Sequence, residues 1–234
     1  MQKNNRTNYI VKEKIVESHD VVTLKLICDA GIPEYIAGQF ITVFFDDIGN
    51  AEGKSYTISS APSEDTLNLT VKGIGEFSNK LCSLNIGDNL EASLPYGYFY
   101  SESDNTSLIM IAGGIGVTPF RSMIADALKS NSSRKLVLFY SNKTSSDIIF
   151  GNEFIELQKT HSTFDINNYL TRQDIVPEGV KSGRITIDDI VNITKDIKDK
   201  EFLICGSIPF VRDFWKGLKE AGIPEETIYT EAFF

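Results

Sequence analysis

A glycine-rich turn between a buried strand and a helix constrains the fold of this chain more than any other feature. The apolar segment Leu108–Ala112 runs into the turn, and a helical pattern begins at Pro119. Glycines let a backbone approach a pyrophosphate closely, and a helix start offers free N–H groups. No Gly-Lys-Ser/Thr follows, and Pro119 replaces the third glycine of a G-x-G-x-x-G turn. The turn predicts a dinucleotide site, and its alternative is a tight connection without a ligand; the candidate residues are Gly113, Gly114, Gly116, Thr118 and Pro119.

The chain changes its pattern near residues 101–106. Before this stretch it shows short strands separated by turns, and after it apolar strands alternate with amphipathic helices. The first pattern is typical of an antiparallel barrel or sandwich, and the second of a doubly wound parallel sheet. We therefore expect an all-β antiparallel barrel or sandwich over residues 1–103 and an α/β nucleotide domain over 104–234. The expected strands are 9–16, 21–27, 40–45, 55–59, 67–72, 89–92, 108–112, 135–140, 163–170 and 201–205, and the expected helices are 78–84, 119–129, 152–159, 187–194 and 209–221.

Composition excludes several classes of function. The formal net charge of −9 disfavours binding to nucleic acid or to an anionic membrane over most of the surface. Cys28, Cys82 and Cys205 are far apart and form no C-x-x-C, so we expect no metal site. There is no apolar run of membrane-spanning length, and the chain starts with polar residues. We expect a cytoplasmic, monomeric protein.

The expected strand at 135–140, which follows the glycine-rich turn and its helix, ends without a carboxylate. A site that prefers NAD would be expected to place Asp or Glu there for the ribose 2′-hydroxyl. Instead the chain offers Ser141, Asn142 and Lys143, and Arg172 follows the next strand. A hydroxyl, an amide and cations suit a 2′-phosphate, which predicts NADP(H) over NAD(H). The alternative for both cations is a solvated surface charge.

Two further segments, in the first half of the chain, combine phosphate-binding and ring-stacking residue types. In Lys54-Ser55-Tyr56-Thr57, strand alternation places Lys54 and Tyr56 on one face and the two hydroxyl residues on the other. About twenty residues later, Gly75-Glu76-Phe77-Ser78 is a glycine turn at a helix start, where Ser78 is expected as N-cap. Ser78 either binds a phosphate oxygen or simply caps the helix.

In chain order, these segments resemble the motifs of the ferredoxin–NADP⁺ reductase superfamily, and the likeness covers nearly the whole chain. It rests on Lys54–Thr57, Gly75–Ser78, Pro95–Phe99, Gly113–Pro119, Cys205-Gly206 and Glu231–Phe234. The resemblance implies a six-stranded antiparallel flavin barrel followed by a nicotinamide domain, with FAD and a nicotinamide dinucleotide meeting in the cleft between them. It also implies hydride transfer to FAD and release of single electrons to an acceptor.

The resemblance assigns roles in the first domain. Lys54 would contact the FAD phosphates, Tyr56 would pack on the isoalloxazine, and Thr57 would lie near flavin N5. The family has Arg where this chain has Lys54, which leaves FMN as an alternative. Gly75–Ser78 would hold the pyrophosphate, and we count Lys72 among the cofactor-binding residues.

In the second domain, Thr118 would lie where the glycine loop nears the flavin. Cys205 and Glu231 would lie near the nicotinamide C4, with Gly206 in the same site. Phe233 would cover the flavin face, and Phe234 would stack on the adenine of a folded FAD. The alternative for this aromatic pair is a hydrophobic C-terminus that packs in the core. The expected catalytic residues are Thr57, Cys205, Glu231 and Phe233.

The chain carries no ferredoxin module, globin or cysteine-rich extension, so the resemblance implies a separate electron acceptor. We expect ferredoxin or flavodoxin first, and an oxygenase component, free flavin or ferric iron second. The rival from another class is a flavoprotein subunit that binds FAD without catalysis.

Overall fold

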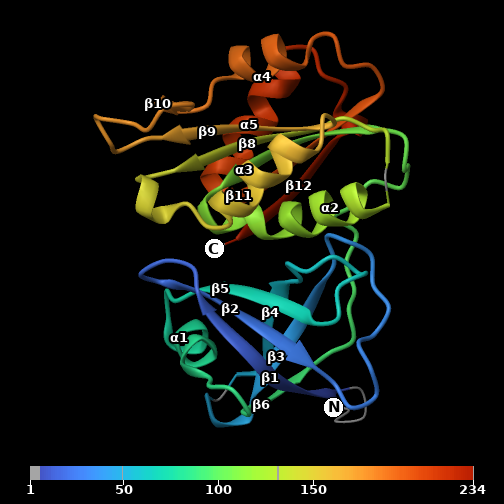
Figure 1. The fold of residues 1–234 in the computed structure, drawn as a ribbon, viewed down its shortest axis with the longest axis vertical. Helices are drawn as coiled ribbons and strands as arrows, with labels where there is room; N and C mark the ends of the chain where they lie inside the picture. The colour runs from blue at the N-terminus through green and yellow to red at the C-terminus, as the bar shows by residue number, and fades with distance from the viewer. Residues whose placement is uncertain (1–5, 49, 131, 234) are drawn as a thin grey trace. The chain divides into compact units, whose positions relative to one another are not determined.

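The computed structural model describes residues 6–48, 50–130 and 132–233, and the chain divides into two compact units (Figure 1). The N-terminal unit contains the chain up to Tyr100 together with Arg121–Asp126. The C-terminal unit contains Ser101–Phe120 and the chain from Ala127 onwards. One helix therefore contributes residues to both units.

The N-terminal unit is an antiparallel sheet of six strands in the order β4-β3-β6-β1-β2-β5. An isolated bridge between Ile58 and Leu69 joins the two end strands, and the Ser59 amide donates to the Asn68 carbonyl at 2.8 Å. The sheet thus closes on itself, which confirms the predicted antiparallel barrel. Its elements are β1 (Thr7–Val16), β2 (Val21–Ile27), β3 (Phe40–Phe45), β4 (Asn50–Thr57), β5 (Leu67–Lys72), α1 (Glu76–Ser83) and β6 (Asn89–Ala92).

Helix α1 begins earlier than the sequence predicts. The prediction that Ser78 is the N-cap is wrong, because Gly75 occupies that position and the helix already includes Glu76. The earlier start places Phe77 and Leu81, four residues apart, on one helix face, and both are buried in the barrel core. Burial of these two apolar side chains outweighs the capping preference of serine.

The C-terminal unit is a parallel sheet in the order β10-β9-β8-β7-β11-β12. Figure 1 shows α2 and α3 on one side of this sheet and α4 and α5 on the other. This arrangement confirms the predicted doubly wound nucleotide domain. Its elements are β7 (Ser107–Gly113), α2 (Thr118–Lys129), β8 (Leu136–Asn142), α3 (Gly151–Thr160), β9 (Phe164–Leu170), β10 (Val180–Ser182), α4 (Ile187–Thr194), β11 (Lys200–Ser207), α5 (Ile208–Glu220) and β12 (Ile228–Phe233).

The strand order reverses between β7 and β11. The chain runs outward from β7 through β8 and β9 to β10, and then returns to place β11 on the other side of β7. In open α/β sheets, ligands bind beyond the carboxyl ends of the strands at such a reversal. The glycine-rich turn that follows β7 lies at this position.

Candidate functional site

The glycines at the end of β7 and in the turn that follows are each required for a different structural reason. Gly114 has φ +54, in the left-handed region, and a Cβ added there would meet nothing within 4 Å. A Cβ on Gly116 would lie 2.3 Å from the Cys205 carbonyl oxygen and 2.9 Å from the Gly206 amide nitrogen. Gly116 is therefore needed to pack the turn against β11, and Gly114 leaves the backbone open to a ligand.

Gly113 and Gly206 share an aromatic neighbour that the sequence did not single out. Added Cβ atoms would lie 3.2 Å from the Phe210 ring at Gly113 and 2.8 Å from it at Gly206. Phe210 belongs to the first turn of α5 and packs on Phe214, with 4.6 Å between ring centroids. The only signal in the sequence was an aromatic residue shortly after Cys205-Gly206.

Cys205 and Glu231 are paired across neighbouring strands. They are register partners in the parallel β11–β12 pair, and Cys205 is also the partner of Ala112 on β7. Burial raises the pKa of the Cys205 thiol well above its ordinary value, and the charge of Glu231 raises it further, against a smaller effect of the Gly206 amide. At neutral pH the pair therefore consists of a neutral thiol beside a carboxyl group.

The predicted 2′-phosphate residues gather at the carboxyl ends of β8 and β9. The Arg172 amide donates to the Lys143 carbonyl at 2.8 Å, and both residues are exposed. Ser141 is the register partner of Gly113, so these groups continue from the glycine turn along the sheet edge. Within the described part of the chain, the buried amide nitrogen and oxygen of Asn142 have no hydrogen-bond partner. A buried amide without partners is costly, so this one suits a polar ligand at the strand end.

The barrel brings together three residues that were assigned to the flavin. The rings of Tyr56 and Phe77 are stacked, with centroids 6.3 Å apart and an interplanar angle of 21°. The exposed Lys54 has its Nζ 6.0 Å from the Phe77 centroid. Burial raises the pKa of the Tyr56 hydroxyl, with a smaller contribution from Cys82, so it is neutral at physiological pH. The cluster offers aromatic surface beside a cation, as a ring with a phosphate requires.

Three other predicted residues of the barrel, Ser55, Lys72 and Ser78, have side-chain partners in the protein. Ser55 Oγ hydrogen bonds with Thr42 at 3.1 Å. The Lys72 ammonium lies 2.9 Å from an Asp20 carboxylate oxygen. Ser78 Oγ accepts from the Ile74 and Gly75 amides at 2.9 and 3.0 Å. Thr57 is buried at the end of β4, whereas Gly75 and Glu76 are exposed.

The C-terminal aromatic pair is only partly described. Phe233 ends β12 as the register partner of Ser207 and is half-buried. Phe234 lies outside the described residues. Phe233 is thus placed beside the strand that carries Cys205 and Gly206.

Both halves of the chain match families of known proteins. Residues 8–100 match the oxidoreductase FAD-binding domain, and residues 110–216 match the oxidoreductase NAD-binding domain. The chain belongs to the ferredoxin–NADP⁺ reductase superfamily. Members bind FAD and a pyridine nucleotide through these two domains, and the donor set described above fits both groups: an open glycine turn, cations at two strand ends and stacked rings in the barrel.

Relatives of this chain include flavohemoproteins and reductase components of oxygenases. A flavohemoprotein of Rhizobium meliloti is 28% identical over 244 residues, which cover 96% of this chain and 60% of the relative. The reductase subunit of glycine betaine monooxygenase from Chromohalobacter salexigens is 29% identical over 239 residues, covering 98% and 65%. The chain therefore spans about three fifths of the length of the curated relatives that it matches.

A solved structure supports the same fold. A ferredoxin–NADP⁺ reductase from Neisseria gonorrhoeae, with bound FAD and NADP, superposes with a TM-score of 0.81 at 20% identity. The match covers 99% of this chain and 100% of the other.

Residues 6–48, 50–130 and 132–233 were compared with two further features, a membrane-spanning helix and a metal site. No helix among them is long and apolar enough to cross a membrane. No group of three or more His, Cys, Asp or Glu side chains there is arranged to hold a metal ion.

Proposed function

We propose that this chain is an FAD-dependent NAD(P)H oxidoreductase that passes electrons singly to a separate acceptor, with residues 1–103 binding FAD and residues 104–234 binding the nicotinamide dinucleotide. The observation that carries this proposal is the set of groups at the reversal point of the parallel sheet. There the open Gly114 turn, the Cys205–Glu231 pair and the cations after β8 and β9 occur together. A subunit that only held FAD would have no use for such a second nucleotide site.

Each group of residues has a separate task in this proposal. When bound, the flavin accepts two electrons as hydride and releases them one at a time. Lys54 and Tyr56 hold and orient the flavin, with Phe77 stacked against the Tyr56 ring, and Thr57 offers its hydroxyl at the end of β4. Gly113, Gly114 and Thr118 receive the dinucleotide, and Cys205, Gly206 and Glu231 orient the nicotinamide without becoming covalently attached. Phe233 shields the flavin from water.

The purified protein tests this proposal directly. We expect a yellow preparation, or one reconstituted with FAD, whose flavin absorbance bleaches within seconds of anaerobic NADPH addition. A flavin band that neither NADPH nor NADH bleaches supports the non-catalytic flavoprotein instead. A colourless protein that binds neither FAD nor FMN refutes both readings.

We propose NADPH as the preferred donor because Lys143 and Arg172 are joined through their backbones at the strand ends. Two cations beside a 2′-phosphate give charge-assisted hydrogen bonds of about 1.5–3 kcal/mol each. Lys143→Ala and Arg172→Ala are each expected to lower kcat/KM for NADPH by about tenfold or more and to change that for NADH little. Equal losses with the two nucleotides contradict the preference.

For the acceptor we propose ferredoxin or flavodoxin, with an oxygenase component as the second candidate. The second is favoured by the relative that is named as a monooxygenase reductase subunit. Anaerobic reoxidation of the reduced flavin by each acceptor distinguishes the two. We further propose that the protein is monomeric and cytoplasmic, which gel filtration and fractionation of cells test.

A further inference from the structure

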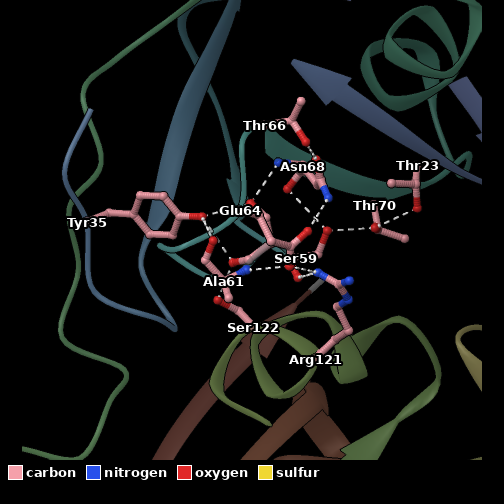
Figure 2. Close-up of polar contacts among 11 residues, drawn as sticks. Thr23, Tyr35, Ser59, Ala61, Glu64, Thr66, Asn68, Thr70, Arg121 and Ser122 are labelled. Atoms are coloured by element: carbon pink, nitrogen blue, oxygen red, sulfur yellow. Dashed lines mark hydrogen bonds and ion pairs between the residues drawn. The ribbon is translucent and has the colours of Figure 1, made fainter. Parts of the chain in front are cut away.

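An ion pair between Glu64 and Arg121 lies at the centre of a polar network in the N-terminal unit (Figure 2). Arg121 Nη1 donates to Glu64 Oε1 at 2.5 Å and to the Ser59 carbonyl at 3.0 Å. The two side chains are only 15% and 29% exposed. An ion pair with this little exposure is screened less by solvent than a surface pair, and the loss of one partner leaves a poorly solvated charge.

The network fixes the backbone of the segment that follows β4. The Ser60 carbonyl accepts from Ser122 Oγ at 2.5 Å and from the Tyr35 hydroxyl at 3.1 Å. Glu64 Oε1 also accepts from the Ala61 amide at 2.9 Å. Figure 2 shows these groups converging on the segment of Ser59 and Ala61 from three separate parts of the chain. Two successive carbonyls and the following amide are therefore held by side chains.

Burial keeps the Tyr35 hydroxyl of the network protonated. It raises the pKa of the Tyr35 hydroxyl, and this effect exceeds the opposing one of the hydrogen bond with Ser60. Tyr35 is 9% exposed and Ser122 is fully buried. These neutral donors stay in place across the physiological pH range, so the network is a fixed support.

The two ends of this support are close in sequence to residues proposed for the reaction. Ser59 lies two residues after Thr57, which ends β4. Arg121 lies three residues after Thr118, one helical turn along α2 from its first residue. Neither Glu64 nor Arg121 belongs to the motifs assigned to FAD or to the dinucleotide. We propose that Glu64 and Arg121 are positioning residues for hydride transfer, which hold the backbone that follows β4 and thereby the position of Thr57 within the N-terminal unit.

This inference rests on the proposed function, and it differs from an ordinary structural role. The Lys25–Glu13 pair, at 2.9 Å, joins β1 and β2, which a ladder of backbone hydrogen bonds already connects. Arg121 and Ser122 instead bind carbonyls of residues that follow the end of β4. A loss of the Glu64–Arg121 pair therefore frees backbone next to Thr57, whereas a loss of the Lys25–Glu13 pair does not.

Stopped-flow reduction of the FAD-loaded full chain tests the proposal. Arg121→Met and Glu64→Gln are expected to lower the limiting rate of flavin bleaching at saturating NADPH by about 10- to 100-fold, because a displacement of about 1 Å costs that much in an oriented reaction. Bound FAD per chain and the NADPH concentration at half-maximal rate are expected to change less than about threefold. The double variant is expected to be no slower than Arg121→Met, since the two groups act as one pair.

Lys25→Met is the matched control, with the wild-type rate expected. Wild-type bleaching rates in Arg121→Met and Glu64→Gln overturn the proposal, even with a lowered Tm, because the pair is then only structural. Loss of FAD from both variants also overturns it, since the pair then serves flavin retention. If the wild-type protein itself is not bleached by NADPH or NADH, the proposed function fails, independently of what the variants show.

Discussion

Substitution of Gly116 by alanine is the sharpest test of how the glycine-rich turn is built. The backbone of Gly116 needs no left-handed conformation, so the effect of an alanine comes from its methyl group alone. That carbon would meet the Cys205 carbonyl oxygen at 2.3 Å, whereas ordinary contacts are 3.4–4 Å. The turn and β11 must therefore separate by about 1 Å at a point where backbone, and not a flexible side chain, stands in the way.

The size of the effect follows from this displacement. Overpacking of a close-packed site costs about 1–3 kcal/mol, which corresponds to a decrease of about 2–12 °C in Tm for a chain of this length. The same shift moves Gly113, Gly114 and Thr118 relative to Cys205. We therefore expect the limiting rate of flavin reduction by NADPH to fall by about 100-fold.

Thermal unfolding followed by circular dichroism, and stopped-flow bleaching, measure the two effects in the same preparation. Gly217→Ala is the matched control in the same unit. Its methyl group would meet the Ile187 side chain at 2.6 Å, and that side chain can turn away. Alanine also favours the helix by about 1 kcal/mol, so Tm is expected to stay level or rise, with unchanged kinetics. A Gly116→Ala protein with the Tm and bleaching rate of the wild type would refute the reasoning.

Three further predictions concern single side chains. Because burial and Glu231 raise the pKa of Cys205, iodoacetamide at about pH 8 is expected to modify the half-exposed Cys28 and to spare Cys205 in the folded protein; peptide mass spectrometry that finds both modified equally fast contradicts this. Burial acts to raise the pKa of Asp20, but the Lys72 ammonium and Ser18 outweigh this effect and lower the pKa. The ion pair therefore stabilises the fold at a pH above the unfolded-state pKa of about 3.9, and this contribution is lost as the pH falls through the lower pKa of the folded state. Asp20→Asn is therefore expected to lower Tm at pH 7, with a difference from wild type that narrows below about pH 4; a difference independent of pH argues against the pair. Asn142→Leu removes a buried amide without partners among the described residues, so we expect a higher Tm together with a higher KM for NADPH, and an unchanged KM means that Asn142 does not face the nucleotide.

The sequence predicted the two architectures because they differ in periodicity, but it missed two strands. β10 has three residues between Gly179 and Gly183, and two of the three are exposed, so it carries no apolar pattern. β12 lies at the other edge of the sheet, and its half-buried and exposed residues do not alternate strongly in hydrophobicity. Edge strands of this kind are defined by backbone pairing with a neighbour, which local sequence does not encode.

Candidate site residues could be named from the sequence where a motif is local, but not where the contacts join distant positions. The turn from Gly113 to Thr118 is contiguous, so its residues could be named from the sequence. Arg121 and Glu64 are 57 positions apart, and in the sequence each one is indistinguishable from an ordinary charged surface residue. Only the fold shows that they form a pair. The predicted start of α1 was wrong because the capping preference of Ser78 is visible in the sequence, whereas the burial of Phe77 is not.

The division of helix α2 between the two units affects how proteins of this superfamily can be recombined. A cut at the change of pattern near residue 100 leaves Arg121 and Ser122 on the other fragment, although both bind the barrel segment after β4. A chimera that joins this barrel to the nucleotide domain of a relative inherits that relative's residues at the two positions. A compatible exchange must therefore transfer part of α2 together with the barrel. The segment to be exchanged is thus not bounded by the linker near residue 100.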